Sequence, residues 1–317
     1  MTLAVLVRFP FATRPWALPV LVDLYRSAED NQRRGRPHRT PAQLLCRLLR
    51  LKLLWVPDRT FDFVGDSAYG THEVARFVTR HRNRLSLVSN LHPDANLFEP
   101  PPHYTGKGRP RVKGSRLPKP RQVAATARRR PLTVAWYGGG TRRVEVVHGV
   151  GHWYKSGQGL IALVWVFVHD LTGTHRDEYF FSTDLRLTPT QLIGRYTARW
   201  NIETTFQELR AWLGLETTCG WCRNTVLRAA PCLFGLYTVV ALLYAAMPES
   251  QRVGGVSWPG KAGVTFSDAL SAVRRWLWTE VVFPQAAGND ISKNSPRRCA
   301  NSSFPRSPRA HKVHQSS

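Results

Sequence analysis

Four side chains between residues 195 and 210 have types and spacings that suit chemistry on phosphate groups. They are Tyr196, Arg199, Glu203 and Arg210. On a helix, at about 100° per residue, all four fall within about 60° of arc. A neighbouring apolar stripe, from Ile202 through Phe206 to Leu213, indicates the face that packs. The spacing therefore predicts one helix that presents these four side chains together.

This face would place one carboxylate between two guanidinium groups and a phenol. A carboxylate binds hard cations, and arginine holds phosphate through two parallel hydrogen bonds. The tyrosine can bond a phosphate through its hydroxyl or stack on a base. The pattern favours metal-dependent phosphodiester chemistry. A surface helix with an ordinary ion pair between Arg199 and Glu203 has the same spacing, so geometry alone leaves both interpretations open.

Another carboxylate stands where a predicted strand ends. Phe61 to Gly65 is a short apolar run that predicts a buried strand, and Asp66 follows it in Asp66-Ser-Ala-Tyr-Gly70. Thr71 is placed to cap a helix that reaches about Arg80. Leu85 to Leu91 predicts a further strand. This strand–helix–strand order is typical of an α/β protein.

Together the two motifs resemble those of insertion-sequence DDE transposases. Tyr196-x2-Arg199-x3-Glu203-x6-Arg210 is similar to the Y-R-E-K signature of that family, with Arg210 in place of the final lysine. The segment from Gly65 to Gly70 is similar to the second-aspartate motif. The resemblance covers about residues 1–285.

The resemblance implies an RNase H-like mixed sheet with flanking helices and a β-rich insertion before the last catalytic helix. It implies that Asp66 and Glu203 are catalytic and bind Mg²⁺, with Mn²⁺ as the alternative, for cleavage and strand transfer at insertion-sequence ends. Tyr196, Arg199 and Arg210 would contact DNA, although arginine differs from lysine in reach and geometry. The implied partners are transposon-end and target DNA, and a second copy in a homodimeric synaptic complex.

The resemblance also requires a first aspartate on the first strand of the sheet. Asp58 and Asp62 are too close to Asp66, and Asp23 is the only earlier aspartate with apolar neighbours on both sides. Asp23 follows what looks like a later strand, so it is a weak substitute. We therefore expect the first strand and its aspartate to precede Met1, which would leave the metal site incomplete and cleavage inefficient. A non-catalytic, DNA-binding remnant is the first alternative.

The composition points to a polyanionic partner. The chain of 317 residues has 45 Lys and Arg against 21 Asp and Glu, a formal net charge of +24. Its 43% hydrophobic residues can form a core, which excludes a wholly disordered polycation. Residues 100–143 contain no acidic residue, and over 100–131 we expect an extended, solvated arm that binds DNA. The candidate DNA-binding residues of this arm are Lys107, Arg109, Arg111 and Lys113.

The remaining patterns predict further elements and four parts of the chain. Ala4 to Val7 predicts a strand, and Thr40-Pro41 and Thr188-Pro189 have the composition of helix starts. The second of these helices would reach about Leu213. The predicted parts are the first part of the core (1–94), a basic β-rich insertion (95–185), the catalytic and C-terminal helices (186–285) and a disordered basic tail (286–317).

One apolar segment and one cysteine pair bear on the cellular location. Ala229 to Met247 carries no charge and meets the minimum length of a membrane-spanning helix, but Pro231 and Gly235 interrupt it. A buried core helix is the preferred interpretation, and a basic membrane-associated protein is the second alternative.

Cys219 and Cys222 have no partner pair at zinc-site spacing, which favours reduced thiols. We expect a cytoplasmic, nucleoid-associated protein without a membrane partner.

Overall fold

The computed structural model describes the chain except residues 105, 107, 217–224, 253–254, 256–258 and 283–317. The chain divides into two units, 1–273 and 274–317. Of the second unit, only 274–282 is described, and it is helical. The predictions for Lys107, for Cys219 and Cys222, and for the tail over 286–317 lie outside the described residues.

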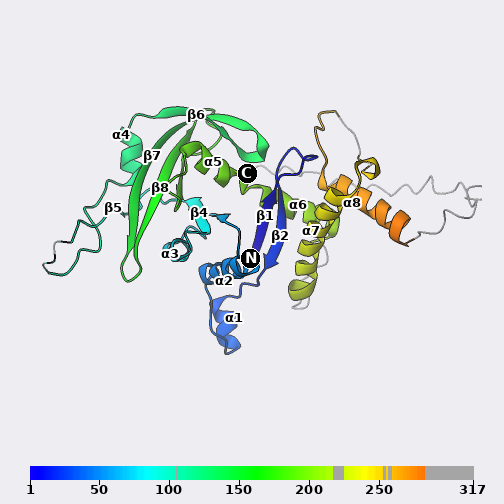
Figure 1. The fold of residues 1–317 in the computed structure, drawn as a ribbon, viewed down its shortest axis with the longest axis horizontal. Helices are drawn as coiled ribbons and strands as arrows, with labels where there is room; N and C mark the ends of the chain where they lie inside the picture. Colours follow the sequence, from blue (N-terminus) through cyan, green and yellow to red (C-terminus); the bar gives the residue numbers. More distant parts are fainter. Residues whose placement is uncertain (105, 107, 217–224, 253–254, 256–258, 283–317) are drawn as a thin grey trace, which may run out of the picture. The chain divides into compact units, whose positions relative to one another are not determined.

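Seven strands form one mixed sheet in the order β3-β4-β9-β8-β7-β5, with β6 paired to β7 (Figure 1). β3 and β4 are parallel, and the other pairs are antiparallel. A separate antiparallel pair is formed by β1 and β2. The strands are β1 (Thr2–Val7), β2 (Trp16–Val22), β3 (Phe61–Val64), β4 (Leu85–Asn90), β5 (Leu97–Phe98), β6 (Arg130–Ala135), β7 (Thr141–Lys155), β8 (Gly159–Asp170) and β9 (Glu178–Ser182).

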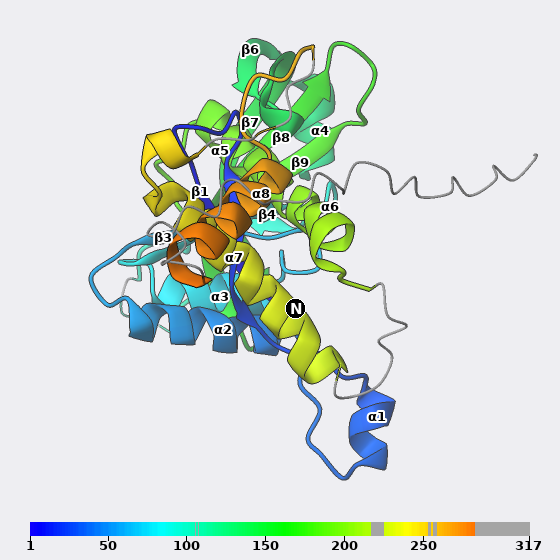
Figure 2. The ribbon, with the colours of Figure 1, turned by 90° about the vertical axis from the view of Figure 1, so that its right-hand side faces the viewer.

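Helices cover both faces of the seven-stranded sheet (Figures 1 and 2). In β8, Trp165 packs in the cluster that contains side chains of α2 and α3, whereas Val166 packs in the cluster that contains α5. A nearly continuous apolar strand is expected where both faces are buried. The helices are α1 (Ala28–Arg33), α2 (Pro41–Trp55), α3 (His72–Arg80), α4 (Pro120–Thr126), α5 (Pro189–Ala198), α6 (Asn201–Leu213), α7 (Ala230–Ala246) and α8 (Phe266–Trp276).

The predicted helix starts are confirmed by their caps. The hydroxyls of Thr40, Thr71 and Thr188 each accept a hydrogen bond from the backbone N–H three residues later, and they precede α2, α3 and α5. The expected strands are also present, and those of the β-rich segment continue the sheet of β3 and β4 through the β4–β9 pair. The domain limits within this arrangement stay predictions.

The strand before Asp66 is not buried as predicted. β3 pairs with β4 on one side only, and of its residues Phe61, Phe63 and Val64 are half-buried while Asp62 is exposed. Its apolar composition is that of an interior strand. The prediction failed because burial depends on neighbouring strands, and β3 has only one among the described residues.

The single helix predicted from Thr188 to Leu213 is two helices, α5 and α6. The Arg199 N–H donates to the Tyr196 carbonyl at 3.1 Å, and the Glu203 N–H donates to that of Trp200 at 3.0 Å. These bonds span three residues instead of four, so the chain turns further per residue than in an α-helix. The common face predicted for the four side chains is therefore broken between Tyr196 and Glu203.

The arm predicted as extended and solvated over 100–131 is partly ordered against β5. The Glu99 N–H donates to the Ser115 carbonyl and the Leu117 N–H to the Leu97 carbonyl, each at 2.9 Å. α4 follows, with Pro120 in its first turn, where proline is favoured. The solvated-arm prediction holds only for part of the segment, because Leu117 and the apolar side of α4 pack on the core.

The apolar helix predicted to be buried packs along one face only. In α7, Tyr237 and Ala241 are fully buried, whereas Leu236, Val239 and Leu242 are 43–51% exposed. The helix that includes it, Thr225–Ala246, is long and apolar enough to cross a membrane by length and composition. A single helix that meets this test gives weak support for a membrane span.

Candidate active site

Asp66 lies in a tight loop between β3 and α3. Its carboxylate Oδ1 accepts a hydrogen bond from the Ala68 N–H at 3.0 Å. Its backbone carbonyl accepts bonds from the N–H groups of Tyr69 and Gly70 and from the Ser89 hydroxyl, at 2.8–3.1 Å. The loop is thus fixed to β4, and the turn sets the direction of the carboxylate.

Two glycines allow this loop to pack closely. A Cβ on Gly70 would lie 2.6 Å from the Ser89 Oγ and 3.0 Å from the Asn90 carbonyl oxygen. A Cβ on Gly65 would lie 2.9 Å from the Tyr69 Cβ. Both positions therefore need glycine because of close approach, which explains why the motif begins and ends with it.

The structure brings Asp66 and Glu203 to one cavity of about 580 Å³. Asp66 reaches it from the end of β3 and Glu203 from the first turn of α6. Asp23, which directly follows β2, also lines this cavity, as does Arg199. Two carboxylates that are far apart in the sequence thus line the same cavity. Asp23, the weak substitute for the first aspartate, lines it too.

Two of these three carboxylates already have basic partners. Arg47 donates a hydrogen bond to the Asp23 carboxylate, and the Arg199 guanidinium lies 3.6 Å from the Glu203 carboxylate. Among the described residues, no three His, Cys, Asp or Glu side chains form a group that could hold a metal ion. The carboxylates share a cavity without converging on one point.

Comparison with known families adds a second line of support. Residues 2–143, which include Asp66, match the family described as DDE superfamily endonuclease. Residues 157–243, which include Glu203, match the archaeal transposase family ISC1217. Together the two matches support a DDE transposase of the insertion-sequence type. A search of curated proteins found no match. The mixed sheet with flanking helices agrees with the RNase H-like fold expected of a DDE nuclease.

Tyr196 lies in α5, before the turn, and Glu203 lies in α6, after it. The Arg199 guanidinium, which pairs with Glu203, also lies 5.6 Å from the centre of the Tyr196 ring. The Tyr196 ring stacks on Phe180, with centres 4.1 Å apart, and its hydroxyl donates to the Asn90 side chain. Burial raises the pKa of Tyr196, so its hydroxyl keeps its proton. It lines a second cavity, of about 620 Å³, which also contains Asp66 and Glu178. Asp66 thus borders both cavities.

Of the remaining predicted DNA-binding residues, Arg199 lines the first cavity, whereas Arg210, Arg109, Arg111 and Lys113 lie outside both cavities. The Arg210 Nε donates to Glu216 at 2.7 Å, and the Arg210 side chain is half-exposed. Arg109 and Arg111 are exposed. The Lys113 ammonium lies 3.9 Å from the ring centre of Phe98, and this cation–π contact holds it against the sheet.

Two polar residues near the site carried no recognisable signal in the sequence. Glu178 begins β9 in the second cavity, where the Tyr137 hydroxyl donates to it at 3.1 Å. Burial raises the pKa of Glu178 above its ordinary value. Arg47, the partner of Asp23, lies on α2 among leucines. The contacts that matter for both residues are made with partners far away in the sequence, so spacing could not reveal them.

Proposed function

We propose that this transposase cleaves and joins DNA at insertion-sequence ends, with Asp66 and Glu203 as its metal-binding catalytic residues. The observation that supports this assignment is that both carboxylates line one cavity although they come from separate motifs. Each also lies in a segment matched by a nuclease or transposase family.

The donor chemistry of the cavity fits a hard divalent cation. Nucleases of the DDE superfamily typically use divalent metals, and carboxylate oxygens are suitable ligands for Mg²⁺ and Mn²⁺. A cation held by Asp66 and Glu203 would lower the pKa of an attacking water or 3′-hydroxyl and stabilise the leaving oxygen. Asp23 lines the same cavity, but Arg47 donates a hydrogen bond to its carboxylate and therefore competes with a metal ion for it. We therefore propose a weak, two-carboxylate site and inefficient cleavage.

The basic residues near the site would bind the DNA backbone. Arg199 lines the cavity beside Glu203, so its guanidinium can reach a phosphate held there. Arg210 lies two helical turns further along α6 and can contact the strand beyond it. The arm residues Arg109, Arg111 and Lys113, with Lys107, would add sequence-independent phosphate contacts, which weaken steeply as salt increases.

Cleavage of labelled DNA that carries the ends of the element tests this assignment. We expect Asp66→Asn and Glu203→Gln each to abolish the Mg²⁺- or Mn²⁺-dependent nicks while leaving binding of the DNA nearly unchanged. Asp58→Asn is the matched control, because Asp58 is exposed and lies outside the cavity. Equal nicking by the wild-type chain and both variants would exclude these two residues as catalytic.

A non-catalytic, DNA-binding protein is the second candidate. The observation that favours it is the ion pair that occupies Asp23 and leaves only two carboxylates. It predicts salt-sensitive binding of the ends without nicks under any metal condition. Metal-dependent nicking that Asp23→Ala abolishes would instead show that Asp23 completes the catalytic set.

Assembly and location are proposed from the family. We propose a homodimer that pairs two DNA ends, and a cytoplasmic protein associated with the nucleoid. Light scattering with and without end DNA measures the assembly. Recovery in the soluble fraction at high salt, where binding to anionic lipid and to DNA is screened, would exclude the membrane alternative raised by Thr225–Ala246.

A further inference from the structure

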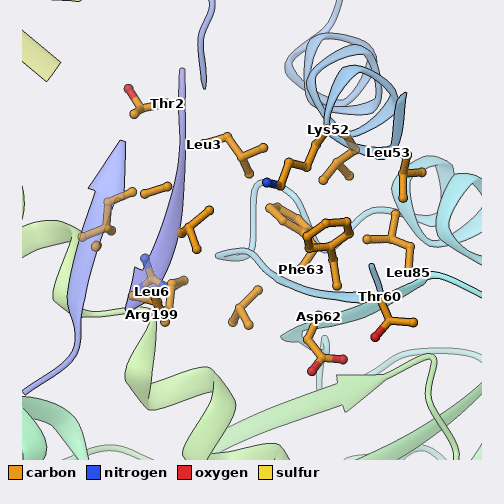
Figure 3. Close-up of a pocket in the computed structure, with 17 residues that line it drawn as sticks. Thr2, Leu3, Leu6, Lys52, Leu53, Thr60, Asp62, Phe63, Leu85 and Arg199 are labelled. Carbon is orange, nitrogen blue, oxygen red and sulfur yellow. The ribbon is translucent and has the colours of Figure 1, made fainter. Parts of the chain in front are cut away.

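A group of arginines lines a cavity at the end of the sheet opposite to Asp66. β3 and β4 are parallel, and Asp66 follows the carboxyl end of β3. The cavity, of about 680 Å³, is lined by residues 60–62 and 82–86, at the amino ends of the two strands. Thr60 and Asp62, which also line the neighbouring cavity drawn in Figure 3, stand at this end of β3. We call the space of 680 Å³ the arginine cavity.

The basic side chains of the arginine cavity come from three separate segments. Arg82 and Arg84 lie between α3 and β4, Arg186 lies between β9 and α5, and Arg195 lies in α5. Arg82 and Arg186 are exposed to solvent. The cavity shares no lining residue with the two cavities that Asp66 borders. The fold thus gathers these arginines at a place that is separate from the candidate active site.

The two aspartates of the arginine cavity are already paired. The Nε and Nη2 atoms of Arg186 donate to the Asp184 carboxylate at 2.9 and 3.1 Å. The Asp62 carboxylate lies 2.9 Å from the Arg195 guanidinium and accepts a hydrogen bond from the Ser86 hydroxyl. Four guanidinium groups against two carboxylates leave a positive charge, and a concave surface of one sign attracts the opposite ion. The cavity therefore suits an anion.

Two buried guanidinium nitrogens of this cavity lack a hydrogen-bond acceptor. Arg84 donates through Nη2 to two backbone carbonyls at the end of α2, but its buried Nε has no partner among the described residues. The Nη1 atom of Arg195 is close to Asp62 without making a hydrogen bond to it. Buried donors normally have an acceptor. An anion in the cavity would supply the acceptors that these two arginines lack.

We propose that the arginine cavity binds the phosphodiester backbone of DNA, at a point away from the phosphate held at Asp66 and Glu203. Guanidinium groups match the paired oxygens of a phosphate. The exposed positions of Arg82 and Arg186 favour a long polyanion that passes across the cavity over a small enclosed ion. Contacts with the backbone fix the position of DNA without reading its sequence. The cavity would therefore hold DNA and take no part in the chemistry.

The lengths of β3 and β4 set how far the DNA must extend to reach the arginine cavity. The strands contain four and six residues, so at about 3.3 Å per residue their ends are about 13–20 Å apart. Successive phosphates of one DNA strand rise by about 3.4 Å along the duplex, so the contact should lie about four to six nucleotides from the reacting phosphate. This spacing rests on the proposed function, whereas DNA binding by the cavity does not.

Substitution of the two exposed arginines tests DNA binding by the cavity. Arg82→Gln combined with Arg186→Gln should weaken binding of a long duplex by about tenfold. It should also lower the slope of log affinity against log salt concentration by about two, since two phosphate contacts are lost. Arg33→Gln combined with Arg34→Gln is the matched control, because it removes the same charge from exposed arginines of α1. Equal affinities and slopes in the two double variants would overturn the proposal.

End DNAs of decreasing length test the spacing. The duplex is cut back step by step toward the reacting phosphate, and the wild-type chain is compared with the variant of Arg82 and Arg186. The difference in affinity should disappear once fewer than about four nucleotides remain on the side that reaches the cavity. A difference that does not depend on where the duplex ends supports DNA binding by the cavity and contradicts the proposed position of the reacting phosphate at Asp66 and Glu203.

Inorganic phosphate separates a DNA site from a site for a small anion. Calorimetry without DNA should show only weak binding of phosphate to the wild-type chain. Tight binding of phosphate that the double variant of Arg82 and Arg186 abolishes, together with unchanged binding of DNA, would assign the cavity to a small anion and overturn the proposal. Urea unfolding provides the control for folding, and the double variant should match the wild-type chain because both side chains are exposed.

Discussion

The strand β8 and the strand β3 belong to the same sheet, yet their surroundings differ sharply. β8 pairs on both sides, and its residues from Leu163 to Val168 are buried. β3 pairs on one side, and no residue of it is fully buried. The residues proposed for catalysis lie at the β3 end. The half of the sheet around β8 thus has its strands paired on both sides, and we expect it to be the stable half. The open half ends at β3, which has one unpaired edge among the described residues and leads to Asp66.

The largest expected effect comes from a core truncation in the completed half. Leu163→Ala should lower the free energy of unfolding by about 3–5 kcal/mol, because Leu163 is fully buried and its removal leaves a cavity. Leu6→Ala is the matched change in β1, which lines a cavity with the unpaired edge of β3. Leu6 is 38% exposed, so the change should lower the free energy of unfolding by about 1 kcal/mol or less. Urea unfolding measures the free energy of unfolding of both variants. Similar losses in the two would contradict the difference in stability between the two regions.

The next effect concerns a buried carboxylate at the end of β8. Burial opposes ionisation of Asp170, but hydrogen bonds from Thr172, Thr174 and His175 outweigh it and hold the pKa well below its ordinary value. Arg142 adds an ion pair at 2.8 Å. Asp170→Ala should therefore cost about 2–4 kcal/mol at neutral pH.

The sign of the pH dependence gives the control for Asp170. The ionised Asp170 carboxylate should make its full contribution to the free energy of unfolding above its unfolded pKa of 3.8. That contribution should disappear as the pH falls through the pKa of Asp170 in the folded chain. The difference in stability between the wild-type chain and Asp170→Ala should therefore shrink in acid. A difference that stays constant down to pH 2 would contradict the role of the charge.

A smaller effect is expected in the loop that positions Asp66. Gly70→Ala should cost about 1–3 kcal/mol, because its Cβ would meet Ser89 and Asn90 of β4. It should also displace the Asp66 carboxylate and weaken metal binding. Gly140→Ala is the control, since a Cβ there meets no atom within 4 Å and its φ is −81°. Thermal unfolding of the two variants compares them, and equal melting temperatures would show that the loop can adjust.

The smallest effect tests Glu178, in the second cavity beside Asp66. Because burial raises its pKa, the folded chain binds more protons than the unfolded chain above pH 4.5, and stability falls as the pH rises through the folded value. Glu178→Gln should remove this loss and stabilise the chain by about 1 kcal/mol or less at pH 7. Unfolding at pH 4 and pH 7 measures the change, and a destabilised variant at pH 7 would contradict it.

Local features of the sequence predicted much of the fold. The threonine caps and the strand that ends at Asp66 depend on neighbouring residues, so they could be recognised from the sequence alone. The motifs also identified Asp66 and Glu203, which line one cavity. These features need no knowledge of distant contacts.

Other features depend on tertiary contacts and could not be predicted. The turn between α5 and α6 accommodates Tyr196 against Phe180 and Asn90, which are distant in sequence. The exposure of β3 follows from an unpaired edge, and composition does not record which strands are neighbours. The pairing of Asp23 with Arg47 likewise joins a strand end to a helix face.

Binding of Mn²⁺, followed by electron paramagnetic resonance, tests the central claim that Asp66 and Glu203 form one metal site. The account predicts weak binding of Mn²⁺ by the wild-type chain, a loss of affinity of about tenfold or more in Asp66→Asn and in Glu203→Gln, and no further loss in the double variant. Asp58→Asn should bind as the wild-type chain does. Binding that neither substitution changes, or that only one of the two substitutions weakens, would show that the two carboxylates do not share a metal ion.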